Sequence, residues 1–101
     1  MIAIPQDKLA DLIRGAYDMS VPVGLGFIHA QPGSLTDDEV SAIIKPTGRI
    51  AASMDYVKGR QCKMTVFRDG DGNLSINDSW YDHSDTQLRR LLESIGVQAI
   101  A

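Results

Sequence analysis

Three cationic side chains stand close together near the middle of the chain. Lys58, Arg60 and Lys63 fall within six consecutive positions. Ammonium and guanidinium groups bind phosphate and carboxylate, and an arginine can donate two parallel hydrogen bonds to one such anion. This cluster predicts a site for a small anionic ligand.

Aromatic rings and a histidine flank the cations in the sequence. Tyr56 precedes them, and Trp80-Tyr81-Asp82-His83 follows. Such rings can stack on a base or another planar group. The predicted ligand-binding residues are Tyr56, Lys58, Arg60, Lys63, Trp80 and His83. The alternative is structural: Trp80 and Tyr81 complete a core or an interface, and the turn lysine is solvated.

The same region offers little for catalysis. Cys62 is predicted on the strand face that carries Met64 and Val66, so we expect it to be buried and inert. An enzyme that uses His83 with Asp82 is the weakest of the function hypotheses, and no catalytic residue is assigned.

A metal or cofactor site is not predicted either. Asp69-x-Asp71-x-Asn73 imitates the start of a calcium loop, but Leu74 stands where that loop needs glycine and Trp80 where it needs glutamate. The stretch therefore predicts a hairpin turn. His29, Cys62 and His83 lack the spacing of zinc ligands.

The residues around the cations alternate as strands do. Ile50, Ala52, Met54 and Tyr56 form one apolar face, residues 57–60 form a hairpin turn with Gly59 at positive φ, and Cys62, Met64 and Val66 form the apolar face of a second strand. Residues 69–73 then reverse the chain before a third strand at Leu74 and Ile76. This pattern predicts a three-stranded antiparallel meander.

Three helices are predicted outside the meander. The spacing of apolar residues predicts the first over residues 5–18. The second begins at the N-cap Thr36, where Glu39 closes a capping box, and it ends before Pro46. The third begins at Ser84 and ends at Gly96. The predicted fold is α+β, a three- to four-stranded antiparallel meander packed against about three helices. The fourth strand would come from residues 23–30 or from the tail 97–101.

Composition predicts one domain over residues 1–101, with a formal charge of −3 and a single cysteine. The charge disfavours binding to nucleic acid or anionic membranes. The absence of a basic leader and of a long apolar run predicts a cytoplasmic protein. A domain of this size buries only roughly 60–65% of its unfolded surface, and this small core predicts a homo-oligomer, most simply a dimer.

The second half of the chain resembles a known group of small proteins. Asp55-Tyr56-x-x-Gly59-Arg60-x-x-Lys63, with Trp80-Tyr81-Asp82-His83-x-x-x-Gln87-Leu88-x-x-Leu91-Leu92, is similar to small proteins encoded by phages and prophages. The group supplies no catalytic residue to carry over. The resemblance implies a protein that acts by binding, either by blocking a host protein or by sequestering a nucleotide signal.

Two binding functions therefore lead. The first is a non-enzymatic protein that recognises a small anionic ligand, such as a nucleotide, at the basic and aromatic hairpin. The second is a protein–protein interaction module, such as an inhibitor of a host protein, that uses a strand edge or the surface around Trp80 and Tyr81.

Overall fold

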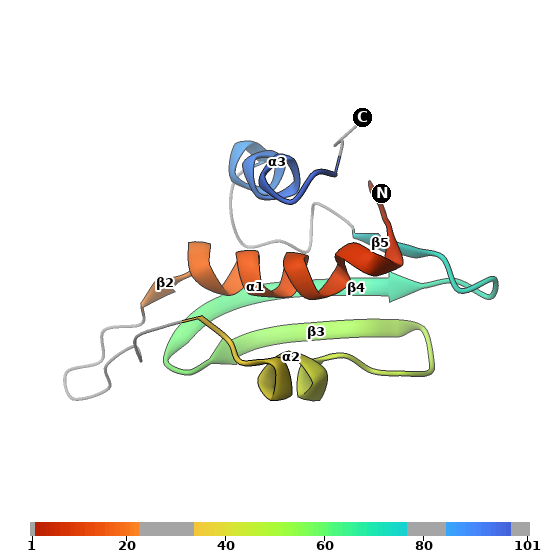
Figure 1. The fold of residues 1–101 in the computed structure, drawn as a ribbon, viewed down its shortest axis with the longest axis horizontal. Helices are drawn as coiled ribbons and strands as arrows, with labels where there is room; N and C mark the ends of the chain where they lie inside the picture. Colours follow the sequence, from red (N-terminus) through yellow and green to blue (C-terminus); the bar gives the residue numbers. More distant parts are fainter. Residues whose placement is uncertain (1, 23–33, 77–84, 98–101) are drawn as a thin grey trace.

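The computed structural model describes residues 2–22, 34–76 and 85–97, which form an antiparallel sheet and three α-helices (Figure 1). The elements in chain order are β1 (Ile2–Ile4), a 3₁₀ turn (Gln6–Lys8), α1 (Leu9–Met19), β2 (Val21–Pro22), α2 (Asp37–Ile43), β3 (Ile50–Val57), β4 (Arg60–Arg68), β5 (Leu74–Ile76) and α3 (Asp85–Ser94). The predicted α+β class is confirmed.

Strand β4 is the centre of the sheet. β3 pairs with one edge of β4, while β5 and β2 share the other edge, β5 at the end of β4 and β2 at its start. β1 pairs with the outer edge of β5. The meander β3–β4–β5 is the predicted one, and β1 and β2 extend it. The fourth strand predicted at residues 23–30 or in the tail falls almost wholly outside the described residues.

Local signals begin α2 and end α3 as the sequence predicts, whereas α1 begins at Leu9, after a 3₁₀ turn, and not at residue 5. Thr36 caps α2, because its Oγ1 accepts a hydrogen bond from the Glu39 N–H at 3.2 Å and its own N–H donates to Glu39 Oε1 at 2.9 Å. Gly96, at φ 82°, ends α3, and the Val97 N–H donates to the Leu92 carbonyl at 2.8 Å. The start predicted at Ser84 lies outside the described residues.

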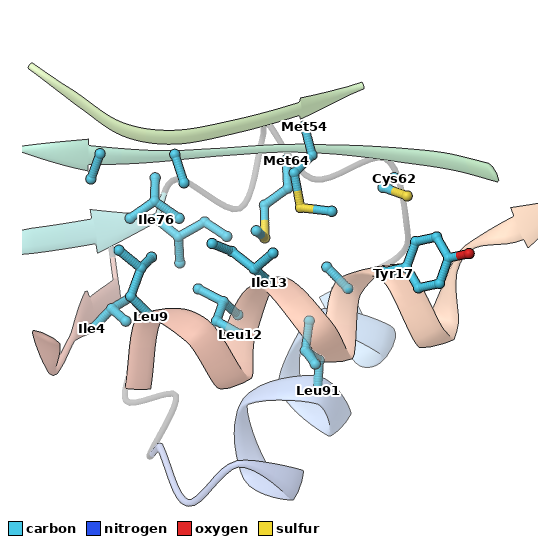
Figure 2. Packing of buried hydrophobic residues seen from close by; sticks show 14 of the residues in the cluster. Ile4, Leu9, Leu12, Ile13, Tyr17, Met54, Cys62, Met64, Ile76 and Leu91 are labelled. Atoms are coloured by element: carbon cyan, nitrogen blue, oxygen red, sulfur yellow. The ribbon is translucent and has the colours of Figure 1, made fainter. Parts of the chain in front are cut away.

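Helix α1 lies between the sheet and α3. Its buried residues face the apolar side of the sheet, and Leu91 of α3 approaches from the far side of α1 (Figure 2). Gly15 permits this approach, because a Cβ at that position would stand 2.3 Å from Leu91 Cδ1. α2 packs beside α1 and against β3. The core is therefore one cluster that includes residues from the sheet and from all three helices.

Two β-bulges correct the predicted strand pattern. We expected Ile50, Ala52, Met54 and Tyr56 on one apolar face, but Ile50 is 38% exposed and Tyr56 is 63% exposed. The register of β3 against β4 shifts between Ile50 and Ala52 and again between Met54 and Tyr56. The first shift has its extra residue in β3 and the second has it in β4, and the alternation of buried and exposed residues along β3 is broken at both. Ala51 and Ala52 are both buried as a result, and the two larger side chains leave the core face.

Candidate functional site

The turn between β3 and β4 holds the first two predicted ligand residues. Lys58 has φ 52° and Gly59 has φ 80°, which is the pattern of a type I′ hairpin turn. The predicted turn and the positive φ of Gly59 are confirmed. Glycine adopts this conformation without strain, whereas a lysine side chain rarely does. The side chain of Lys58 makes contacts that help to hold the residue in this conformation.

Those contacts are made with α1 and α2. Lys58 Nζ lies 3.1 Å from Glu39 Oε1 and 6.0 Å from the centroid of the Tyr17 ring. The Lys58 side chain is only 21% exposed, so it is not an ordinary solvated turn lysine. Hydrogen bonds from the Thr36 backbone, and then from Lys58, hold the pKa of the Glu39 carboxyl below its usual value. Glu39 is thus ionised at neutral pH and balances the charge of Lys58.

Arg60 approaches the same ring from the start of β4. Its guanidinium carbon lies 5.5 Å from the Tyr17 centroid, and its Nη1 donates to the Ser20 carbonyl at 2.9 Å. Ser20 follows the last turn of α1, where carbonyl groups lack helical partners and favour cations. Arg60 Nε is buried and has no hydrogen-bond partner among the described residues. Arg60 therefore acts first as a cap for α1.

The other two described candidates, Tyr56 and Lys63, lie on the opposite side of the sheet. Residues paired across antiparallel strands share a face, and Tyr56 pairs with Gln61 whereas Val57 pairs with Arg60. Lys63 is exposed between the buried residues Cys62 and Met64. The four described residues thus divide into two pairs, one on each face. Trp80 and His83, like Tyr81 and Asp82, lie outside the described residues.

The face opposite α1, here called the outer face, carries aromatic, aliphatic and small polar side chains. Strand register and exposure together place there Ala3, Ile50, Ser53, Tyr56, Gln61, Lys63, Thr65, Phe67 and Ser75. Asp55 and Lys63 are the exposed charged residues within β3 and β4, and their charges are opposite. The exposed charges of these two strands therefore balance each other.

Cys62 is buried beneath the hairpin turn, as expected. Its Sγ donates weakly to the Arg60 carbonyl at 3.5 Å, and burial raises the pKa of its thiol. The thiol therefore stays protonated at neutral pH. A protonated, buried thiol is a poor nucleophile.

The Asp69–Asn73 turn uses its oxygen side chains to hold itself together. Asp69 Oδ1 accepts hydrogen bonds from the N–H groups of Asp71 and Asn73, both at 2.9 Å, and Asp69 Oδ2 accepts one from Asn73 Nδ2 at 3.3 Å. These bonds, led by that from the Asn73 backbone, lower the pKa of the Asp69 carboxyl. In residues 2–22, 34–76 and 85–97, no three His, Cys, Asp or Glu side chains are arranged to hold a metal ion.

Sequence reasoning missed two features. It did not connect the hairpin cations to Tyr17, Ser20 and Glu39, which are far away in the chain. It also passed over a groove at the other end of the hairpin, beside Arg49 and Arg68. The sequence does contain a signal for this groove, because Arg49 follows Gly48 and Arg68 lies two residues before Gly70. A search for strand periodicity does not detect such a pairing of arginine and glycine.

Comparison of the chain with protein-family models, with curated proteins and with solved structures finds no match. Among the described helices, none combines the length and the apolar character needed to cross a membrane.

Proposed function

We propose that this chain is a non-enzymatic binding protein that recognises another protein through the outer face of its sheet. The observation that carries the proposal is the position of Tyr56 and Ile50, the exposed large hydrophobic residues of the described chain, which both lie on β3 and on that face. Exposed aromatic residues often supply much of the binding energy of protein interfaces.

The charge of this surface favours a protein partner over a polyanion. The exposed charges within β3 and β4 are those of Asp55 and Lys63, which cancel, and the chain as a whole carries −3. Nucleic-acid sites need an excess of positive charge, whereas the centres of protein interfaces have few charges and more aromatic residues. The expected partner surface is uncharged and partly apolar, on a protein of the cytoplasm.

Recognition of a small anion at the hairpin turn remains the second candidate. Glu39 already pairs with Lys58, and Ser20 already accepts from Arg60, so an anion there would compete with contacts that hold α1 and α2. Arg60 nevertheless has no carboxylate partner in the part of the chain that the structure describes. Under this candidate, Arg60→Ala would cost more affinity than Lys58→Ala, because arginine can make two charge-assisted hydrogen bonds.

Site-specific crosslinking in the host tests the first proposal. A photo-crosslinking amino acid replaces Tyr56, and in a matched control it replaces Glu93, an exposed residue of α3. We expect a defined protein adduct from position 56 and none from position 93. Excess wild-type protein should suppress the adduct, and excess Tyr56→Ser should not.

Two results would count against a protein partner. Equal adducts from both positions, or none from position 56, would contradict the use of the outer face. A native mass spectrum of the protein purified gently from its host then distinguishes the second candidate, because it reports a bound small molecule by its mass. A small molecule lost in Arg60→Ala and kept in Tyr56→Ser would favour the hairpin site.

A further inference from the structure

A groove lies at the end of the β3–β4 hairpin opposite its turn. Figure 1 shows the start of β3 and the end of β4 together at that end of the sheet. The groove has a volume of about 690 Å³ and is lined by Gly48, Arg49, Phe67, Arg68, Asp69 and Gly70. This volume is within the range of about 300–1,000 Å³ that is typical of small-molecule sites.

Arg68 gives the groove a fixed cationic wall. Its Nη1 donates to the Gly48 carbonyl at 3.1 Å, and its Nη2 donates to the Lys45 carbonyl at 2.8 Å. Its backbone N–H also donates to the Arg49 carbonyl at 2.6 Å. These bonds tie the loop before β3 to the end of β4. A guanidinium has five N–H donors, so Arg68 keeps unused donors and its full charge.

Arg49 is the second cation, and its side chain has no partner in residues 2–22, 34–76 and 85–97. It is exposed and makes neither an ion pair nor a hydrogen bond with its guanidinium. Arg14 and Lys58, in contrast, are paired with Asp37 and Glu39. The Arg49 guanidinium is therefore available to a ligand without the loss of an existing contact.

One lining residue carries the opposite charge. Asp69 is ionised, and it lowers the positive potential of the groove. Both of its carboxylate oxygens accept hydrogen bonds from its own turn, however, so they are directed to Asp71 and Asn73. The two arginines exceed this single charge. The groove therefore keeps a net positive charge.

We propose that this groove binds the phosphate group of a small ligand. Two guanidinium groups suit a tetrahedral oxyanion, because each can donate two hydrogen bonds to it. The backbone on both sides is open, since a Cβ at Gly48 or at Gly70 would meet no atom within 4 Å. A phosphate can therefore approach the main chain, and Phe67 adds an apolar wall for the rest of the ligand. The two arginines that would hold the phosphate lie outside the outer face, and the groove shares only Phe67 with it.

Titrations followed by amide NMR test the site with three probes at constant ionic strength: inorganic phosphate, adenosine monophosphate and adenosine. We expect saturable shifts at residues 48–49 and 67–70 with both phosphate-bearing probes and none with adenosine. Arg49→Gln should weaken binding by about tenfold or more, because charge-assisted bonds are lost. Its thermal midpoint should stay unchanged, since the Arg49 guanidinium has no partner among the described residues and the substitution keeps the backbone hydrogen bond of Arg49.

The matched control is Lys63→Gln, which removes one exposed cation from the outer face away from the groove. It should change the affinity by less than about twofold. Equal affinity for inorganic phosphate and adenosine monophosphate would assign the site to the free anion, whereas tighter binding of the nucleotide would assign it to a phosphate carried on a larger molecule. Absence of saturable shifts, equal binding of adenosine, or equal losses in the two variants would overturn the proposal.

Discussion

Each cation at the hairpin turn has a partner on another element. Lys58 pairs with Glu39 of α2, and Arg60 donates to the Ser20 carbonyl beyond α1. Both also approach the Tyr17 ring, at distances where a cation and an aromatic face attract each other. These residues therefore join the hairpin to two helices. Their charged groups already interact with Glu39 and with the Ser20 carbonyl.

Thr36→Ala should destabilise the protein by about 1 kcal/mol, because the Glu39 N–H loses the acceptor that caps α2. The free energy of unfolding from urea titration measures this effect. Thr36→Ser keeps the hydroxyl and should be close to wild type. A loss of partner or phosphate binding at an unchanged free energy of unfolding would contradict the capping role.

Glu39→Gln should change how stability depends on pH. The pKa of Glu39 is lower in the folded protein than in the unfolded chain, so ionised Glu39 stabilises the fold above the usual glutamate pKa of about 4.3. This stabilisation is lost as the pH falls through the lower, folded-state pKa. Wild type should therefore exceed Glu39→Gln in unfolding free energy at pH about 7, and the difference should shrink by pH about 3. An equal difference at both pH values would rule out the charge of Glu39 as the cause.

Helix α1 connects the layers of the molecule. Tyr17 and other buried residues on one side of it pack against the sheet, while Gly15 on another side meets Leu91 of α3 (Figure 2). Leu91 is 1% exposed, so it has little room to move away. The distance between these two helices is therefore set by the absence of a side chain at position 15.

Gly15→Ala should destabilise the protein despite the better helix propensity of alanine. Propensity favours alanine by about 1 kcal/mol, whereas overpacking against Leu91 costs about 1–3 kcal/mol. In a Leu91→Ala background the clash is gone, and Gly15→Ala should then be neutral or stabilising. Unfolding free energies of the two single variants and the double variant measure this coupling. Additive effects would show that Leu91 does not limit the helix contact.

At the scale of the whole molecule, the outer face and the groove differ in charge. The outer face presents Tyr56 and Ile50 with nearly balanced charges, and the groove at one end of the sheet presents Arg49 and Arg68. The radius of gyration of 13.3 Å is close to the value of about 13 Å expected for a single domain of this length. Under the two proposals, the outer face and the groove would serve different ligands on the same chain.

We predict that the chain forms a dimer. A domain of 101 residues has a small core, and association would bury further apolar surface. Sedimentation equilibrium at high micromolar concentration should give twice the mass of the chain. Tyr56→Ser tests whether the outer face contributes, because it would weaken a dimer formed there and leave any other dimer intact. A monomer across the full concentration range would contradict the prediction.

Much of the fold was predictable because its signals are local. The capping box at Thr36, the glycine that ends α3 and the positive φ at Gly59 each depend on residues within one turn of chain. The spacing of the apolar residues in α1 and α3 depends on one helix at a time. Such interactions are encoded by neighbours in the sequence, and the α+β class follows from their order.

The sites were less predictable because tertiary contacts decide them. Alternation placed Tyr56 on the apolar face with Met54, but the register shift between these two residues, which arises from the pairing of β3 with β4, moved Tyr56 to the outer face. The cations near the hairpin turn were chosen by type and spacing, whereas their partners lie 19 residues away for Lys58 and 40 residues away for Arg60. The sequence by itself determined the three helices, the hairpin turn and the β3–β4–β5 meander, whereas β1 and β2 follow from tertiary pairing with β5 and β4. Only packing determined which charges remain free, because that depends on which distant elements meet.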